Sequence, residues 1–243
     1  MYENGALSLA TGGPLHPGEW MITERMLTLC KLCAGSRVLD IGCGDGSTLE
    51  FLLESAAINA IGLDRSENML HRGRERAPGL PLTCALGTAL PIASEQVDAV
   101  LAECSLSAIA EIEIVLAEVW RVLRPGGWLA ISDIYVRDPA GDAFLRALPV
   151  NCGLRDAVGQ PELFRHLQEH DFEIQLFEDH SEVIKELTRQ IVTSHGSISA
   201  FWKQSEPEAD LFEIVHAISK TKLGYFVAIA KKRLAIKGDD SNG

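Results

Sequence analysis

The stretch RVLDIGCGDG, residues 37–46, decides how this 243-residue chain folds. Its first five residues are mostly apolar, as in a buried strand, and glycine then stands at every second position, at Gly42, Gly44 and Gly46. A strand that breaks into glycines and then enters a helix brings bare backbone against a ligand, beside the helix N-terminus. We therefore predict a ligand-binding loop at the end of the first strand, with Asp40 just inside it.

The spacing of these glycines distinguishes between two kinds of ligand-binding loop. The dinucleotide fingerprint Gly-x-Gly-x-x-Gly requires a glycine at position 47, where this chain has Ser47. The third glycine comes one residue earlier, at Gly46. A nucleotide-dependent oxidoreductase is therefore kept only as an alternative interpretation of this loop.

Length, charge and cysteine content restrict the class of protein further. A chain of this length can bury roughly 70–75% of its unfolded surface, so it needs neither a metal nor a disulfide to fold. Its net charge of −12 disfavours nucleic acid as a partner, because phosphate backbones are also negative. We expect no membrane span and no secretory signal, and the six scattered cysteines indicate reduced thiols in a cytoplasm. The oligomeric state stays open.

Apolar strand segments alternate with segments of helical periodicity, the pattern of an α/β protein with a doubly wound, mostly parallel sheet. We predict a single domain over 1–243, with an N-terminal cap or lid (1–34), a ligand-binding core (35–135) and a helical insert (181–221) that caps the substrate. Pro125-Gly126-Gly127 is predicted to be a turn between a helix and a strand. Strands are expected at 37–42, 58–63, 82–86, 97–102, 128–134, 172–177 and 224–230, and helices at 23–33, 47–55, 66–76, 112–123 and 161–170.

Polar residues follow the strands at the positions where a doubly wound sheet binds its ligands. Asp64 ends the second strand, Gly87-Thr88-Ala89 follows the third, and Glu103-Cys104 closes the fourth. The helix before the fifth strand reads EVWRVLRPGG over 118–127. Together with the glycine loop, these ordered motifs resemble those of the class I S-adenosylmethionine (SAM)-dependent methyltransferases over residues 37–135. The resemblance implies a Rossmann-like sheet of order 3-2-1-4-5-7-6 with an antiparallel seventh strand, and SAM as the cofactor.

The resemblance also implies a role for each strand end. The glycine loop and Asp40 hold the methionine part of SAM, and Asp64 accepts the ribose hydroxyls. Thr88 stands where the family has an Asp that binds the adenine amino group, which leaves a backbone contact at Thr88 or Ala89. The predicted cofactor-binding residues are Asp40, Gly42, Cys43, Gly44, Gly46, Asp64, Arg65, Gly87, Thr88, Ala89 and Glu103.

The acceptor of the methyl group is expected to be a small molecule. Methyl transfer from a sulfonium is an in-line displacement, so the protein mainly has to place the nucleophile against the methyl carbon. A hydroxyl nucleophile also needs a general base, and Glu103 is the leading candidate because a carboxylate in an apolar site can have a raised pKa. Strand alternation points only one of Glu103 and Cys104 at the ligand, and Asp133 at the end of the fifth strand is an alternative base.

Two cysteines keep another acceptor open. Cys104 and Cys152, after the fourth and fifth strands, are laid out as in the arsenite methyltransferases, which bind trivalent arsenic through cysteines at these two places. The other cysteines do not match that family and are explained as small buried hydrophobes, with Cys30 and Cys33 in a predicted helix. The histidines show no metal-ligand spacing, so no metal site is predicted. An arsenite or thiol methyltransferase and a non-catalytic SAM-binding protein remain as alternatives.

Overall fold

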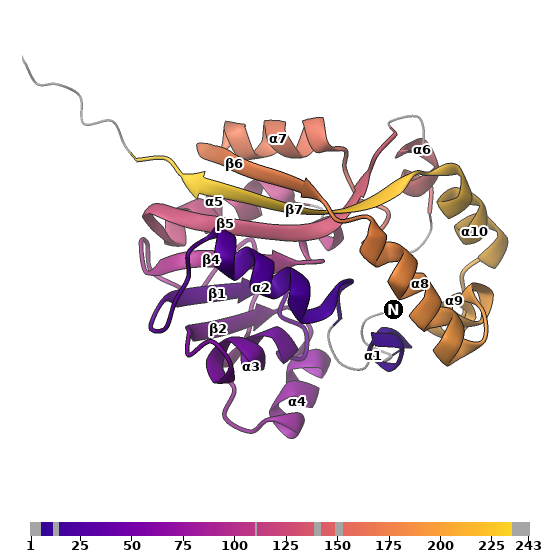
Figure 1. Cartoon of the computed structure of the whole chain (residues 1–243), viewed down its shortest axis with the longest axis horizontal. Coiled ribbons are helices and arrows are strands. Elements are labelled where there is room, and N and C mark those ends of the chain that lie inside the picture. Colours follow the sequence, from indigo (N-terminus) through magenta and orange to yellow (C-terminus); the bar gives the residue numbers. More distant parts are fainter. Residues whose placement is uncertain (1–5, 12–14, 110, 139–141, 149–152, 235–243) are drawn as a thin grey trace, which may run out of the picture.

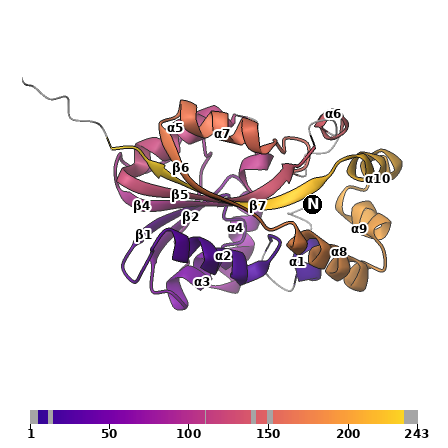
Figure 2. The ribbon, with the colours of Figure 1, turned by 45° about the horizontal axis from the view of Figure 1, so that its top comes forward.

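The computed structural model describes residues 6–11, 15–109, 111–138, 142–148 and 153–234. A seven-stranded sheet of order β3-β2-β1-β4-β5-β7-β6 lies at the centre of the molecule (Figures 1 and 2). All neighbouring strands are parallel except β7, which is antiparallel to both β5 and β6, so the predicted sheet order is confirmed. The strands are β1 (Arg37–Ile41), β2 (Asn59–Asp64), β3 (Leu82–Cys84), β4 (Val97–Glu103), β5 (Leu123–Val136), β6 (Phe172–Asp179) and β7 (Leu223–Lys232).

Helices cover both faces of the sheet, as Figure 2 shows. Three helices pack on one face: α2 (Glu19–Leu29), α3 (Ser47–Glu54) and α4 (Glu67–Arg76). Two pack on the other: α5 (Ile112–Val122) and α7 (Gln160–Glu169). The apolar residues of α5 recur at helical spacing along one side and are fully buried, which explains why this segment forms a helix on the sheet; they are Val115, Leu116, Val119 and Val122.

A third apolar cluster lies beyond the end of the sheet and holds a group of short helices together (Figure 1). The predicted insert between the sixth and seventh strands is helical and consists of α8 (Glu182–His195), α9 (Ile198–Ser205) and α10 (Leu211–Lys220). These helices pack with α1 (Ala6–Thr11) and α6 (Asp142–Arg146) around the buried Phe201 and Trp202. The N-terminal segment and the insert, far apart in the sequence, thus share one small core.

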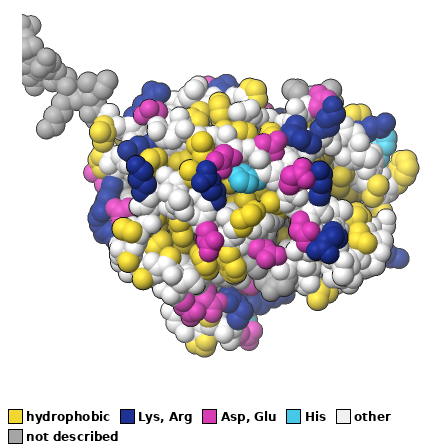
Figure 3. Space-filling view, in the orientation of Figure 1, with side chains coloured by type: hydrophobic (Ala, Val, Ile, Leu, Met, Phe, Trp, Pro, Cys, Tyr) yellow, Lys and Arg dark blue, Asp and Glu magenta, His cyan; other side chains and the backbone are white. Residues whose placement is uncertain are grey.

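Charged side chains of both signs are interspersed over the face of the molecule shown in Figure 3, so neither sign dominates there. Among the helices that the structure describes, none has both the length and the apolar character needed to cross a bilayer.

Two predicted elements have a boundary that differs from the structure by more than two residues. The segment Pro125-Gly126-Gly127 belongs to β5 instead of forming a separate turn. Val97 pairs with Leu123 and Ala99 with Trp128, so the residues between them bulge out of the ladder without ending it. Turn-forming residues indicate a local bend, but pairing of the flanking residues with β4 keeps the bend inside the strand.

The other error concerns the helix predicted over 23–33. The structure places α2 at Glu19–Leu29, and Lys31 adopts a left-handed φ of 54°, which a continuing helix does not permit. Cys30 is therefore buried at the end of the helix, whereas Cys33 lies beyond it and is exposed. The two thiols do not share one helix face.

Candidate functional site

A cavity of about 580 Å³ lies at the carboxyl ends of β1, β2 and β4. Parallel strands bring their carboxyl ends to one edge of a sheet, so the loops that follow them converge there. The cavity is lined by more acidic than basic side chains. Arg65 and His16 are the only lining residues that carry or can carry a positive charge among those described. Six lining residues are carboxylates: Asp40, Asp45, Asp64, Glu103, Glu111 and Asp156. The cavity is therefore suited to a ligand that carries positive charge.

The loop after β1 can take its path only because Gly42 has no side chain. Gly42 has a φ of +71°, and a Cβ atom added to it would lie 2.4 Å from the Cβ atom of Ser105 in the loop after β4. The amides of Gly42 and Cys43 both donate to the carbonyl of Leu63 at the end of β2, over 2.7 and 3.0 Å. The glycine loop is thus clamped between the ends of β2 and β4.

Asp40 lies at the base of the cavity with part of its hydrogen-bonding capacity unused. It is 2% exposed, and its Oδ2 atom has no hydrogen-bond partner among the described residues. Burial raises the pKa of the Asp40 carboxyl well above its usual value, and the neighbouring charges of Glu103 and Asp64 add to this effect. A cationic ligand group placed against Asp40 would favour its charged form.

Asp64 is held rigidly at the end of β2 by two backbone amides. Its Oδ2 atom accepts a bond from the amide of Gly44 (2.9 Å) and its Oδ1 atom accepts one from the amide of Ser66 (2.8 Å). Each carboxylate oxygen can accept more than one hydrogen bond, so both oxygens keep capacity for donors from the cavity. Asp64 therefore links the glycine loop to the start of α4 and presents its carboxylate to a ligand.

Glu103, predicted to be a general base, joins three elements at the end of β4. Its side chain is 4% exposed. Its Oε1 atom accepts a bond from Thr23 of α2 and its Oε2 atom accepts one from Thr48 of α3, each over 2.9 Å. The Nε2 atom of His16 lies 3.6 Å from the same Oε2 atom. Glu103 thus lines the cavity with both oxygens already engaged by the protein.

Sequence reasoning missed His16 as a residue of the site. The sequence predicts only an N-terminal cap or lid over 1–34 and no role for this histidine; residues 12–14 lie outside the described residues, but His16 lines the cavity and is 4% exposed. Its ring contacts Trp20 edge-on, and Trp20 stacks on Phe51 of α3 with ring centroids 4.8 Å apart. The His16-Pro17-Gly18 sequence before an amphipathic helix is the only local signal, and it does not by itself distinguish a cavity residue from a loop residue.

Cys104 also lines the cavity, in a strained conformation. Its φ of +49° is unusual for a residue with a side chain, and such strain is concentrated at functional sites. Its Sγ atom lies 3.3 Å from the hydroxyl of Tyr225, which donates in turn to Ser132. Burial raises the pKa of the Cys104 thiol well above its usual value, so the thiol stays protonated. Cys152, its predicted partner, lies outside the described residues.

The structure brings most of the predicted cofactor-binding residues together. Gly46 does not line the cavity and instead precedes the first turn of α3, and Ala89 turns away, with its amide donating to the carbonyl of Leu86. Beyond the predicted set, the cavity extends to Ile109, Glu111 and Asp156, which belong to none of the sequence motifs. The predicted residues that line the cavity are Asp40, Gly42, Cys43, Gly44, Asp64, Arg65, Gly87, Thr88, Glu103 and Cys104.

Asp133, the alternative base, does not line the cavity. It is 3% exposed and accepts bonds from the hydroxyl of Ser107 (2.6 Å) and from its amide (2.9 Å), which ties the loop after β4 to β5. Burial raises the pKa of the Asp133 carboxyl to about 6, although the bonds from Ser107 favour the charged form. Asp133 therefore supports the cavity wall from behind.

The raised pKa of Asp133 predicts how the stability of the protein depends on pH. The native protein retains the Asp133 proton between pH 3.8 and about 6, where the unfolded chain has released it, so the free energy of unfolding falls as the pH rises through this range. We expect Asp133→Asn to remove this contribution, which amounts to about 2–3 kcal/mol between pH 4 and 7. Urea unfolding of both proteins across this pH range measures it; a difference that does not vary with pH would contradict the assignment.

Comparison with known proteins identifies a family and several relatives that are similar to this chain in sequence. A family described as "Methyltransferase domain" matches residues 39–131. The 27-O-demethylrifamycin SV methyltransferase of Amycolatopsis mediterranei (strain S699) is 32% identical, over 70% of this chain and 71% of that protein. A demethylmenaquinone methyltransferase of Corynebacterium urealyticum is 33% identical, over 68% and 70%. Methyltransferase GfsG of Streptomyces halstedii is 33% identical, but the match spans only about half of its length, 54%, and 59% of this chain.

Solved structures share the same fold. The [4+2]-cyclase SpnF superposes with a TM-score of 0.73 at 24% identity and covers 96% of this chain and 94% of its own. The phosphoethanolamine N-methyltransferase 2 of Haemonchus contortus, solved with S-adenosyl-L-methionine, superposes with a TM-score of 0.74 at 18% identity, over 95% of this chain and 56% of its own. At these identities the likeness concerns the fold of the chain.

Proposed function

This chain belongs to the class I SAM-dependent methyltransferases, and from that membership we propose that it transfers the methyl group of SAM to a small organic acceptor. The observation that carries the proposal is the acidic cavity at the ends of β1, β2 and β4, with its glycine loop and buried carboxylates. SAM is the cofactor of this family, and when bound it supplies a methyl group on a positively charged sulfur. The acceptor and the roles of individual residues are the proposed part.

The residues of the cavity fit this cofactor. The Oδ2 atom of Asp40 lacks a hydrogen-bond partner among the described residues and can accept one from a cationic amino group. The loop at Gly42 and Gly44 offers backbone without side chains, and Asp64 can accept bonds from a pair of ribose hydroxyls. Thr88, which lines the same cavity, is proposed to contact the adenine base. These residues would hold the cofactor along the strand ends.

We propose that the acceptor binds in the part of the cavity that is lined by residues outside the predicted cofactor-binding set. That wall includes Cys104, Ile109, Glu111 and Asp156. The main task of the protein there is to hold the nucleophile in line with the bond that breaks, because correct positioning can lower the barrier by about 7–11 kcal/mol. The relatives named above for a demethylated rifamycin and a demethylated menaquinone support a small organic acceptor.

We propose that Glu103 positions the cofactor site and is not the general base. Each Glu103 oxygen accepts a bond from a threonine hydroxyl, and Oε2 also lies 3.6 Å from His16 Nε2, so the carboxylate is directed at α2, α3 and the N-terminal segment. Through these bonds Glu103 fastens α2, and with it His16, against the cavity. Glu103 and His16 would therefore determine how tightly the N-terminal segment closes over the cofactor.

A substitution of Thr23 tests whether Glu103 positions the cofactor site or acts as the general base. Thr23→Val removes one donor to a buried carboxylate, and a bond to a charged group contributes about 1.5–3 kcal/mol, so we expect the KM for SAM to rise about tenfold with kcat nearly unchanged. Thr28→Val is the matched control, because Thr28 lies on the same helix, is exposed and donates its hydroxyl hydrogen bond to the carbonyl of Glu24, away from Glu103. If Glu103→Gln instead abolishes kcat and removes the acidic limb of the pH–rate profile, Glu103 is the base.

The arsenite and non-catalytic alternatives are less well supported. An arsenite site would need Cys104 together with Cys152, which lies outside the described residues. Burial raises the pKa of the Cys104 thiol well above its usual value, which disfavours the thiolate form that such a site requires. SpnF, which shares the fold, is named for a [4+2] cyclisation, so the fold also serves reactions other than methyl transfer. Direct measurement of methyl transfer decides between these possibilities.

The test of the proposed function uses methyl-labelled SAM. The purified chain is incubated with labelled SAM and a panel of acceptors that includes phenols, quinols, alcohols, carboxylic acids, amines and arsenite. We expect SAM to bind and label to pass to at least one organic class, with S-adenosylhomocysteine released in equal amount. Labelling of arsenite alone would indicate that the chain is an arsenite methyltransferase. SAM binding with no labelled product would support a non-catalytic role.

A further inference from the structure

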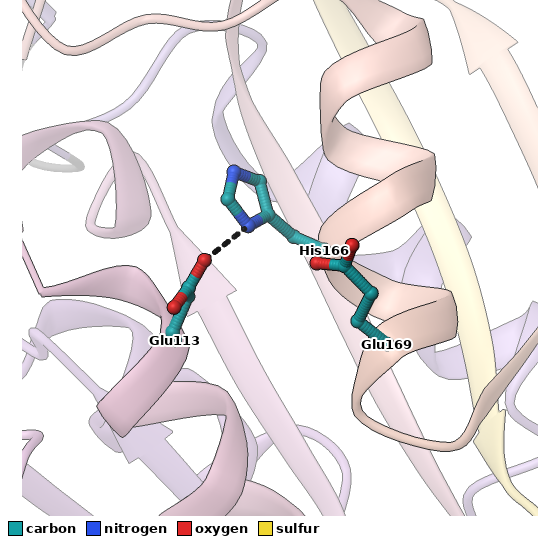
Figure 4. A group of neighbouring side chains, drawn as sticks. All are labelled: Glu113, His166 and Glu169. Carbon is teal, nitrogen blue, oxygen red and sulfur yellow. Dashed lines mark ion pairs between the residues drawn. The ribbon is translucent and has the colours of Figure 1, made fainter.

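Helices α5 and α7 bring three potential metal ligands together away from the cofactor cavity. The two helices lie side by side over one face of the sheet (Figures 1 and 2). Glu113 projects from α5, and His166 and Glu169 project from α7, as Figure 4 shows. One carboxylate oxygen from each glutamate and one imidazole nitrogen all lie within 4.8 Å of one another. Sequence spacing predicted no metal site, since these ligands come from segments more than fifty residues apart.

His166 is the member of this group that points to a ligand. It is 6% exposed, yet its Nδ1 atom has no hydrogen-bond partner among the described residues. That atom is directed at Glu113, whose Oε1 atom lies 3.6 Å away, too far for a hydrogen bond (Figure 4). A buried imidazole nitrogen without a partner is costly, and it faces the open side where both carboxylates can reach it.

We propose that Glu113, His166 and Glu169 form a Zn²⁺ site that joins α5 to α7. One imidazole and two carboxylates are a ligand set that suits Zn²⁺, which takes four ligands at about 2.0–2.2 Å, here with water as the fourth. The glutamate side chains are 62% and 51% exposed, so each has room to turn onto an ion held by the buried imidazole once Glu169 leaves its pairing with Arg165. Such an ion would stabilise the native state to the extent that it binds that state more tightly than the unfolded chain.

Arg165 and Glu162, which lie next to His166, are expected to influence the affinity of the proposed site for Zn²⁺. A guanidinium nitrogen of Arg165 lies 3.2 Å from His166 Nε2, and another donates to Glu169 over 2.7 Å. This arrangement makes Nε2 an acceptor and leaves the proton on Nδ1, so metal binding requires the proton to move to Nε2 and Arg165 to turn away. Glu162, whose Oε1 atom lies 3.9 Å from Nε2, can then accept that proton's hydrogen bond and orient the imidazole. Arg165 is thus a competitor of the ion and Glu162 a supporting residue.

The test measures Zn²⁺ binding by calorimetry and thermal unfolding of the full chain at about pH 7.5. We expect one Zn²⁺ per chain and a raised Tm. Glu113→Gln and His166→Gln should each weaken binding at least about tenfold. Arg165→Gln should tighten it about threefold or more, because it removes a positive charge next to the ion. If the variant at the buried His166 fails to fold, the variant at the exposed Glu113 still tests whether Zn²⁺ binds at this site.

His71→Gln is the matched control, because His71 pairs with Glu75 on the exposed side of α4 and belongs to no group of three potential metal ligands among the described residues. Its Zn²⁺ affinity should equal that of the unmodified chain. Co²⁺ in place of Zn²⁺ reports on the ligands, since a thiolate charge-transfer band would assign the ion to Cys33 or Cys84, which are exposed. Absence of binding, equal affinity in all variants, weaker binding by Arg165→Gln or a thiolate band would each overturn the proposal.

Discussion

Asp64→Ala is expected to weaken SAM binding by at least about tenfold. Two effects combine in this substitution. It removes the carboxylate proposed to accept the ribose hydroxyls, and charge-assisted bonds of this kind contribute about 1.5–3 kcal/mol. It also leaves the amide of Gly44 without its acceptor, so the glycine loop loses the contact that fixes it to the end of β2. Titration calorimetry with SAM measures the change.

The control for this experiment is a carboxylate of the same kind at the opposite end of the sheet. Asp98, near the start of β4, accepts bonds from the amide of Arg37 (2.8 Å) and from Arg124 (2.6 Å), and it does not line the cavity. Asp98→Ala should lower the free energy of unfolding but leave SAM affinity unchanged. If Asp64→Ala binds SAM as tightly as the unmodified chain, the cofactor does not lie across the end of β2.

Gly42→Ala is expected to abolish measurable SAM binding and methyl transfer. The added Cβ atom would lie 2.4 Å from the Cβ atom of Ser105, so either the glycine loop or the loop after β4 has to move. Both loops line the cavity, and a shift of about 1 Å in a site of this kind costs about a hundredfold in rate. The left-handed φ of +71° adds about 1 kcal/mol or more of strain.

Gly35→Ala separates strain from steric overlap. Gly35 has a φ of +83°, but a Cβ atom there would meet nothing within 4 Å. Both variants should therefore lose a similar free energy of unfolding from backbone strain, whereas only Gly42→Ala should lose SAM binding. Equal SAM affinity in the two variants would show that the close approach of Gly42 to Ser105 does not shape the site.

Local patterns were sufficient for much of the fold. The first strand and the helix after it were predicted within one residue of their observed ends, because an apolar run followed by glycines specifies a strand and a turn without reference to the rest of the chain. The same local reasoning failed at Pro125-Gly126-Gly127, where pairing with β4 outweighs the turn tendency. It also failed at the end of α2, where the left-handed Lys31 stops a helix whose apolar pattern continues.

The sequence alone therefore determined the class of fold, the glycine loop and the carboxylate after the second strand, since each is written in neighbouring residues. Only the tertiary structure decided that Thr23 and Thr48, which lie 80 and 55 residues from Glu103, both bond to it, and that His16 reaches the same cavity. It alone brought Glu113 next to His166. The physical reason is that spacing along a strand or helix specifies which face a side chain occupies, whereas the packing of helices on the sheet determines which side chains from distant segments meet.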